Sequence, residues 1–156
     1  MKASLDMATV SNTQQQEAGK DLTGRLRGAS MGLMVMLILQ FGLGIGVNLF
    51  ITPKKGGMGE AFTNGPLLAL HSILGLLVLV AAIGLLVRAI MARHRVVITA
   101  AAIGLGAVLG AAINGVFFLK NGANGSSMGM AVSGLVAMLC YTICLVVLGS
   151  RQPDQA

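Results

Sequence analysis

The residues with the most chemical capability in this chain are a few polar side chains that lie inside long apolar stretches. A polar group in hydrocarbon is costly, so such residues often mark a binding site or a structural hydrogen-bond network. His71 is the most versatile of them, because an imidazole can ligate haem iron or another metal, or carry a proton. The others that we single out are Gln40, Asn48, Asn114, Ser126 and Ser127.

These residues gather near one membrane face if the chain folds as four membrane-crossing helices. All but Gln40 lie within about five residues of the same end of their expected helices, which is roughly 8 Å at a rise of about 1.5 Å per residue. Gln40 lies about two turns below Asn48 on a similar face of the first helix. The sequence therefore predicts one polar layer, to which all four helices contribute.

The predicted polar layer has two interpretations. In the first, it is a small ligand site that opens outward, with His71 at its centre. In the second, it is a structural network in which His71 pairs with Asn48 or Asn114, and such bonds between helices contribute roughly 0.6–2 kcal/mol each. The sequence identifies no catalytic residue and no cluster typical of a metal site.

Haem is one ligand to consider for His71, because an imidazole can be an axial ligand of haem iron. A b-type haem held by histidines needs two of them facing each other. The second histidine, His94, lies among arginines at the other end of the second helix, roughly 30 Å away by helix length. Met128 or Met130 is the alternative second ligand, since a thioether can ligate haem iron. We therefore expect no cofactor in a single chain, and a haem shared across a dimer remains the alternative.

The two cysteines and the carboxylates give no indication of catalysis or ion-coupled transport. Cys140 and Cys144 lie four residues apart on one apolar stretch, without the Cys-x-x-Cys spacing of thiol-redox proteins. We interpret them as small hydrophobic residues. A proton- or sodium-coupled carrier normally places a carboxylate in the membrane, and the apolar stretches contain none. The chain therefore resembles small four-helix multidrug exporters only in size and helix number.

Composition predicts that the elements which position these residues are membrane-spanning helices. Hydrophobic residues make up 55% of the 156 residues and charged residues 10%, against about 25% charged in a typical soluble domain. The mean hydropathy is +0.84. Four apolar stretches reach the roughly 20 residues that a membrane-spanning helix needs. They cover about residues 30–51, 66–87, 96–119 and 126–148.

Short loops between these stretches predict an all-α, antiparallel four-helix bundle over residues 28–149. Residues 1–27 are polar, and we expect a flexible cytoplasmic tail that could end in a short surface helix over Glu17–Arg27. Residues 150–156 form a second cytoplasmic tail.

Basic residues predict the orientation, because loops rich in Lys and Arg stay in the cytoplasm. One side of the membrane receives Lys20, Arg25, Arg27, Arg88, Arg93, Arg95 and Arg151, and the other receives Lys54, Lys55 and Lys120. Both termini are therefore expected in the cytoplasm, with the bundle in the plasma membrane. The formal charge of +6 then indicates contact with anionic lipid headgroups rather than with nucleic acid.

Small residues recur at four-residue spacing in three of the four helices. Such residues let helices approach closely in a membrane, so we expect them to form packing faces. They are Gly42 and Gly46 in the first helix, Gly106 and Gly110 in the third, and Gly125, Gly129, Ser133 and Ala137 in the fourth.

Four segments together resemble a set of small four-helix bacterial membrane proteins that are common in actinobacteria. They are Gln40–Phe50, His71–Gly75, Asn114–Phe118 and Ser127–Ser133. The resemblance covers residues 30–148. It implies a bacterial plasma membrane and a four-helix bundle, and it implies no activity.

Three functional hypotheses follow. The first is a non-enzymatic membrane protein that acts as a partner or assembly subunit through helix packing, with lipid, other membrane subunits or a second copy as partners. The second is a haem- or small-ligand-binding membrane protein that uses His71. The third is a small transporter.

Overall fold

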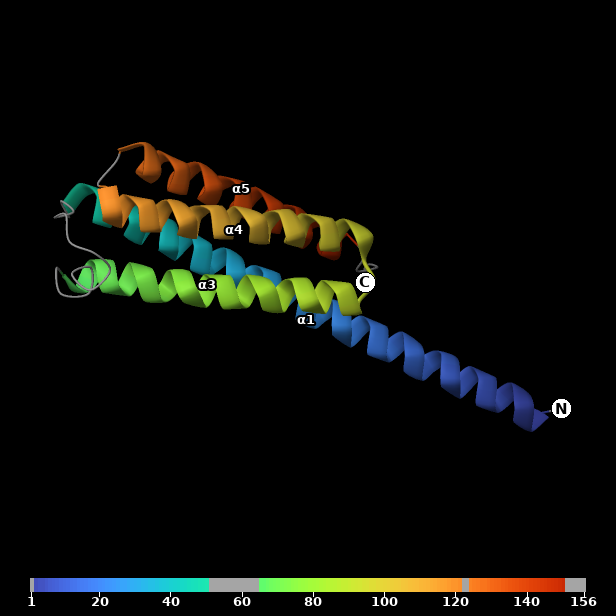
Figure 1. Ribbon diagram of the computed structural model, residues 1–156. Coiled ribbons are helices and arrows are strands. Elements are labelled where there is room, and N and C mark those ends of the chain that lie inside the picture. The colour runs from blue at the N-terminus through green and yellow to red at the C-terminus, as the bar shows by residue number, and fades with distance from the viewer. Residues whose placement is uncertain (1, 51–64, 122–123, 151–156) are drawn as a thin grey trace.

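The structure, a computed structural model, describes residues 2–50, 65–121 and 124–150, with side chains over 22–50, 65–120 and 125–150. The described residues form four α-helices, arranged as in Figure 1, and each contains a segment long and apolar enough to cross a membrane. The prediction of an all-α protein with four such helices is confirmed. The helices are α1 (Lys2–Phe50), α3 (Pro66–Met91), α4 (Arg95–Asn121) and α5 (Asn124–Gly149).

The helix ends follow from local sequence. Pro66 occupies the first turn of α3, where its missing N–H would have no partner within the helix. The same helix runs past the predicted end at residue 87 and stops at Met91. A tight turn then leads into α4. In this turn Arg93 takes a left-handed backbone conformation with φ of 52°, and its N–H donates to the carbonyl oxygen of Ile90 at 3.0 Å.

The N-terminal region, expected as a flexible tail, is helical from Lys2. α1 begins at Lys2 and continues without interruption into the first membrane-spanning segment, which starts at Leu22. Figure 1 shows this first part of α1 projecting beyond the ends of the other helices. The local reason is that the polar stretch Gln14–Ala18 has good helix formers, and no proline interrupts the helix that the apolar segment propagates.

The four helices pack as a ring. α1 contacts α3 and α5, and α4 contacts the same two helices. Within the described residues, the diagonal pairs α1–α4 and α3–α5 make no close backbone approach. Each helix therefore has two neighbours and one outward face, which is the arrangement of a four-helix bundle.

A seven-residue repeat selects the inward face of every helix. In α3 the buried residues are Val78, Ala82, Leu85 and Ala89, so the spacing alternates between four and three residues. This is the spacing that left-handed helix bundles use, because 3.5 residues per turn keeps one stripe facing the neighbours. The equivalent positions in the other helices are also buried: Leu26, Ser30, Leu33 and Leu37; Val97, Ala101, Gly104 and Val108; Ala137, Tyr141, Cys144 and Leu148.

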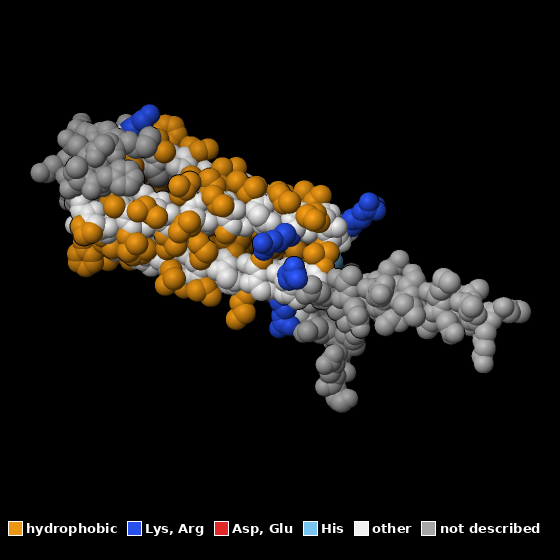
Figure 2. Space-filling view, turned by 90° about the horizontal axis from the view of Figure 1, so that it is seen from below, with side chains coloured by type: hydrophobic (Ala, Val, Ile, Leu, Met, Phe, Trp, Pro, Cys, Tyr) orange, Lys and Arg blue, Asp and Glu red, His pale blue; other side chains and the backbone are white. Residues whose placement is uncertain are grey.

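The outer surface is apolar along the length of the bundle, as Figure 2 shows for one face. Large side chains such as Leu49, Leu76 and Leu139 are at least 62% exposed. In water such a surface would drive aggregation. It suits a protein whose surroundings are lipid tails, because hydrocarbon places no penalty on outward-facing Leu, Ile and Val.

Candidate functional site

Gln40 of α1 and His71 of α3 form the main polar contact between these two helices. Both residues fall on the inward seven-residue repeat of their helices, seven residues from buried Leu33 and Val78 respectively. The side-chain amide nitrogen of Gln40 donates to the backbone oxygen of His71 at 3.0 Å. The same nitrogen lies 3.3 Å from Nε2 of the imidazole. Gln40 therefore bonds the backbone and the ring of one residue on the neighbouring helix.

Two glycines make room for this pair. A Cβ atom at Gly75 would lie 2.9 Å from Nε2 of Gln40, and a Cβ atom at Gly44 would lie 3.2 Å from Cε1 of His71. Gln40 and Gly44 are four residues apart on α1, as are His71 and Gly75 on α3. Each polar side chain thus lies over the glycine of the opposite helix, and this reciprocal fit holds α1 and α3 close together.

The contact between Gln40 and the His71 ring has a consequence for the tautomer of His71. An amide nitrogen only donates, so a hydrogen bond between the two Nε2 atoms requires the imidazole Nε2 to accept and the ring proton to lie on Nδ1. Nδ1 of His71 and Oε1 of Gln40 are both buried and have no hydrogen-bond partner within the described residues. One donor and one acceptor are therefore available there for a small polar group.

Asn48 contacts a different helix. Its Oδ1 atom accepts a hydrogen bond from the Ser127 hydroxyl at 3.0 Å, which joins the end of α1 to the start of α5. Both side chains form this bond near the end of the bundle, and Asn48 is exposed. Ser126, which the sequence placed in the same layer, is half-buried beside Ser127.

Asn114 forms a third, separate group. Its amide nitrogen donates to the carbonyl oxygen of Gly110 on its own helix at 2.8 Å. The side chain lies over Gly129 of α5, where an added Cβ would be 2.5 Å from Oδ1 of Asn114. The fit between Asn114 and Gly129 is thus a second example of a polar side chain over a glycine of the opposite helix.

The predicted polar layer is therefore divided among three helix interfaces. The hydrogen bonds that the structure describes join His71 to Gln40, not to Asn48 or Asn114. This differs from the expected network, in which one of the two asparagines would pair with His71. The reason is geometric: α3 contacts α1 and α4, so only their inward positions can reach His71.

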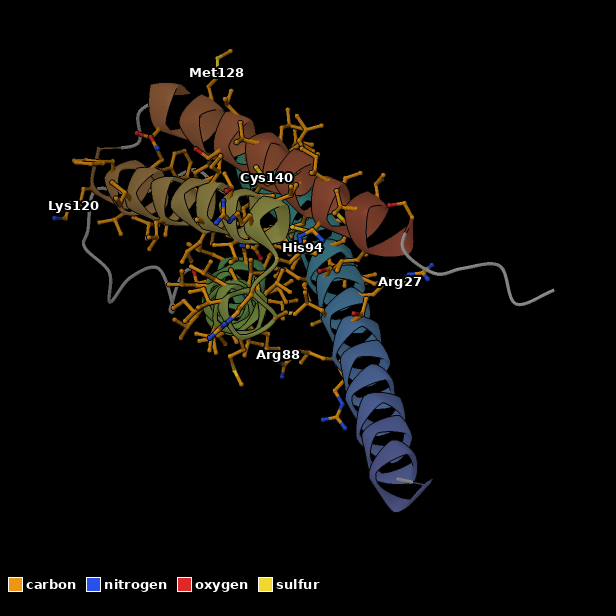
Figure 3. All side chains as sticks on the ribbon, turned by 90° about the vertical axis from the view of Figure 1, so that its right-hand side faces the viewer. Arg27, Arg88, His94, Lys120, Met128 and Cys140 are labelled. Carbon is orange, nitrogen blue, oxygen red and sulfur yellow. The ribbon has the colours of Figure 1, made fainter. Side chains whose placement is uncertain are left out.

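The two methionines suggested as haem ligands are not brought to His71. Both lie on α5, which does not contact α3 within the described residues. Met128 is 71% exposed and points away from the bundle in Figure 3. The sulfur of Met130 lies against α4, 3.5 Å from where a Cβ of Gly115 would be. Among the described residues, Met128 and Met130 therefore do not complete a two-ligand haem site with His71 within one chain.

Tyr141 is a central residue that sequence reasoning did not single out. It is the largest fully buried side chain, and Gly104 of α4 accommodates its ring, since a Cβ there would lie 2.8 Å from Cζ. The phenol oxygen has no hydrogen-bond partner among the described residues. Two sequence features could have drawn attention to the Tyr141–Gly104 pair. They are the single tyrosine of the chain and a glycine in the middle of another helix.

The two cysteines lie beside Tyr141 in the bundle interior. Both are free and buried, and Sγ of Cys144 lies 3.9 Å from the backbone oxygen of Val97. Within the described residues, no group of three or more His, Cys, Asp or Glu side chains is placed to hold a metal ion. Cys140 and Cys144 thus occupy packing positions.

The predicted small-residue faces divide into inner and outer positions. Gly46, Gly110 and Gly129 contact a neighbouring helix, and Ala137 is fully buried. Gly42, Gly106 and Gly125 instead have open space where a Cβ would be. The reason is the seven-residue repeat, since two glycines four residues apart do not both fall on the inward stripe unless the register matches.

The chain was also compared with other proteins. No family model, no curated protein and no solved structure matches it.

Proposed function

We propose that this chain is a non-enzymatic subunit of a membrane assembly, held in the plasma membrane by four crossings and acting through helix packing. The observation that carries the proposal is the set of small residues on the outside of the bundle. Gly42 and Gly106 are exposed and have open space beside their backbones. Small residues in such positions allow a further transmembrane helix to approach closely, and the bundle itself makes no use of them.

α1 carries a further outward series. Gly24, Gly28 and Gly32 are spaced four residues apart, are all exposed and have no neighbouring atom within 4 Å of an added Cβ. Leu26 and Leu33 on the same helix are buried in the bundle, so the glycines lie away from it. These glycines extend the surface that a partner helix or a second copy of the chain would cover.

The assembly proposal is tested by particle mass in native lipid. Wild-type protein is extracted from its own membranes into lipid-preserving polymer particles and compared with the double variant Gly42→Leu and Gly106→Leu. We expect the wild type to run in a complex well above its 16.0 kDa chain mass, and the variant to run as a monomer that still unfolds cooperatively on heating, with a midpoint no higher than that of the wild-type complex. A monomeric wild type in these particles would refute the proposal.

The proposed topology is antiparallel, with both termini in the cytoplasm. Contacts between α1 and α3 support the antiparallel part, because Gln40 meets Gly75 whereas the later Gly44 meets the earlier His71. The distribution of basic residues supports the orientation. Single cysteines in place of Lys120 or Ser150 test it, because the native cysteines are buried. A membrane-impermeant maleimide added to intact cells should label the cysteine at 120 and not the one at 150, and the reverse pattern would contradict the proposal.

Ligand binding at His71 is a second candidate function. It is favoured by the unpartnered, buried Nδ1 of His71 and Oε1 of Gln40. For haem, a ring nitrogen of His71 would have to be freed, either by giving up the contact of Nε2 with Gln40 or by moving the proton from Nδ1, and a second ligand would have to come from another chain. The test is the absorption spectrum of protein purified from a host with ample haem: a Soret band lost in His71→Ala supports the candidate, and colourless protein rejects haem. No feature of the described residues favours the transporter hypothesis.

A further inference from the structure

Five arginines lie together at one end of the bundle, and we call this group the basic end. It consists of Arg25 and Arg27 of α1, Arg88 of α3, Arg93 in the turn and Arg95 at the start of α4. All five are exposed. On the face that Figure 2 shows, most of the blue Lys and Arg side chains lie toward one end of the bundle. Figure 3 views the bundle from this end, with Arg27 and Arg88 labelled.

The two ends of the bundle differ in charge. At the opposite end, the described residues carry one basic side chain, Lys120 in the last turn of α4. The described side chains include no Asp or Glu at either end. The basic end is thus a concentrated positive surface at the level where a spanning helix meets the lipid headgroups.

The turn between α3 and α4 has an arginine at a position whose left-handed backbone conformation favours glycine. Arg93 follows the end of α3 with φ of 52°, a conformation that glycine adopts freely and that L-residues other than Asn and Asp rarely adopt. The residue is exposed, so packing does not require the side chain. Arg88 in the last turn of α3 and Arg95 at the first residue of α4 flank the same turn, and both are exposed.

We infer that Arg88, Arg93 and Arg95 bind the phosphate headgroups of anionic phospholipids at this end of the bundle. Charge complementarity selects the partner, because guanidinium groups bind phosphate through paired hydrogen bonds and a leaflet rich in anionic lipid attracts each nearby arginine. The inference depends on the membrane-spanning fold and not on the proposed assembly role. Arg25 and Arg27 extend the surface along α1.

The test uses phosphatidylglycerol as the anionic lipid and the protein's own cysteines as reporters. Cys140 and Cys144 are buried, so a thiol-reactive fluorogenic maleimide reports unfolding on heating. Full-length protein in neutral detergent is titrated with phosphatidylglycerol, with phosphatidylcholine or with inorganic phosphate. We expect only phosphatidylglycerol to raise the thermal midpoint, with an effect that weakens as salt rises.

Charge removal makes the test residue-specific. Each neutralised arginine should raise the phosphatidylglycerol concentration needed for half the shift by roughly fivefold, so the triple variant Arg88→Gln, Arg93→Gln and Arg95→Gln should need on the order of 100-fold more. Lys120→Gln is the matched control at the opposite end and should leave the titration unchanged. Arg93→Gly serves if the triple variant fails to fold, because glycine accepts the turn conformation while one charge is lost.

Three results would overturn the inference. They are an equal shift with phosphatidylcholine, an equal shift with inorganic phosphate alone, and a titration that neither the triple variant nor Arg93→Gly moves. None of these outcomes bears on the particle mass of the wild-type protein in native lipid. The lipid-binding inference and the assembly proposal are therefore tested independently of each other.

Discussion

The amide nitrogen of Gln40 lies 3.0 Å from the backbone oxygen and 3.3 Å from the imidazole Nε2 of His71, across the interface of α1 and α3. The two residues therefore form one cross-helix unit, with Gly44 and Gly75 as the small residues that permit the approach. This relationship makes the polar contact part of the packing of the bundle, and it sets the first of the predictions below.

Gln40→Ala should destabilise the bundle because it removes both bonds to His71. The expected loss is roughly 0.6–2 kcal/mol for each bond, measured as the free energy of unfolding in mixed micelles. Ser72→Ala is the control, since its hydroxyl bonds only the Leu68 carbonyl of its own helix and should matter little. The double variant with His71→Ala should lose less than the two single losses combined, and strict additivity would show that the pair is not coupled.

Gly104→Ala should destabilise the bundle more than its small size suggests. The added Cβ would lie 2.8 Å from Cζ and 3.0 Å from the hydroxyl oxygen of Tyr141, so the ring or the helix must shift, at about 1–3 kcal/mol. Gly106→Ala is the matched control on the same helix when the chain is monomeric in detergent, since the added methyl then meets open space. The measurement is the thermal midpoint of the three proteins, and equal midpoints would contradict the close packing of Tyr141 on Gly104.

Tyr141→Phe should leave stability unchanged or raise it. The Tyr141 hydroxyl is buried without a hydrogen-bond partner among the described residues, and removal of such a group avoids a desolvation cost of about 1–3 kcal/mol. Thermal unfolding followed by thiol labelling of the buried cysteines gives the comparison. A clear loss of stability in Tyr141→Phe would mean that the hydroxyl is satisfied in the membrane, for example by a bound water.

Gly129→Ala should be destabilising, and a change at Asn114 should rescue it. The added Cβ would lie 2.5 Å from Oδ1 of Asn114, so α4 and α5 would have to separate. Asn114→Ala removes the obstructing side chain at the cost of its bond to the Gly110 carbonyl. The double variant should therefore be more stable than Gly129→Ala alone, and the four unfolding free energies form a complete cycle. Absence of rescue would place the two residues apart.

Much of the fold is predictable because hydrophobic length is a local property. The start of α3 at Pro66 follows from one residue, and the four spanning segments follow from runs without charge. The N-terminal part of α1 was not predicted, because polar sequence alone does not distinguish a flexible tail from a helix that continues out of a spanning segment. The loop between α1 and α3, with Lys54 and Lys55, lies outside the described residues, as do the side chain of Lys20 and the whole of Arg151.

The sequence predicted which polar residues belong to the candidate site, but it did not predict which of them contact each other. Gln40, Asn48, His71 and Asn114 stand out because polar side chains are rare in these stretches. Their partners depend on helix rotation, which a nearly uniform apolar sequence does not reveal. The pairing of Tyr141 with Gly104 was not predicted for the same reason, since nothing local shows that the ring faces this glycine.

The sequence by itself determined four membrane-spanning helices and a contrast in charge between their ends, because these features depend on residue type summed along the chain. Only the tertiary structure decided that Gln40 bonds His71, that Asn48 and Asn114 belong to other interfaces, and which glycines face inward. The physical reason is that lipid tails and the bundle interior are similarly apolar. Hydrophobicity therefore cannot orient a helix here, and the fit of large side chains against small ones must do so.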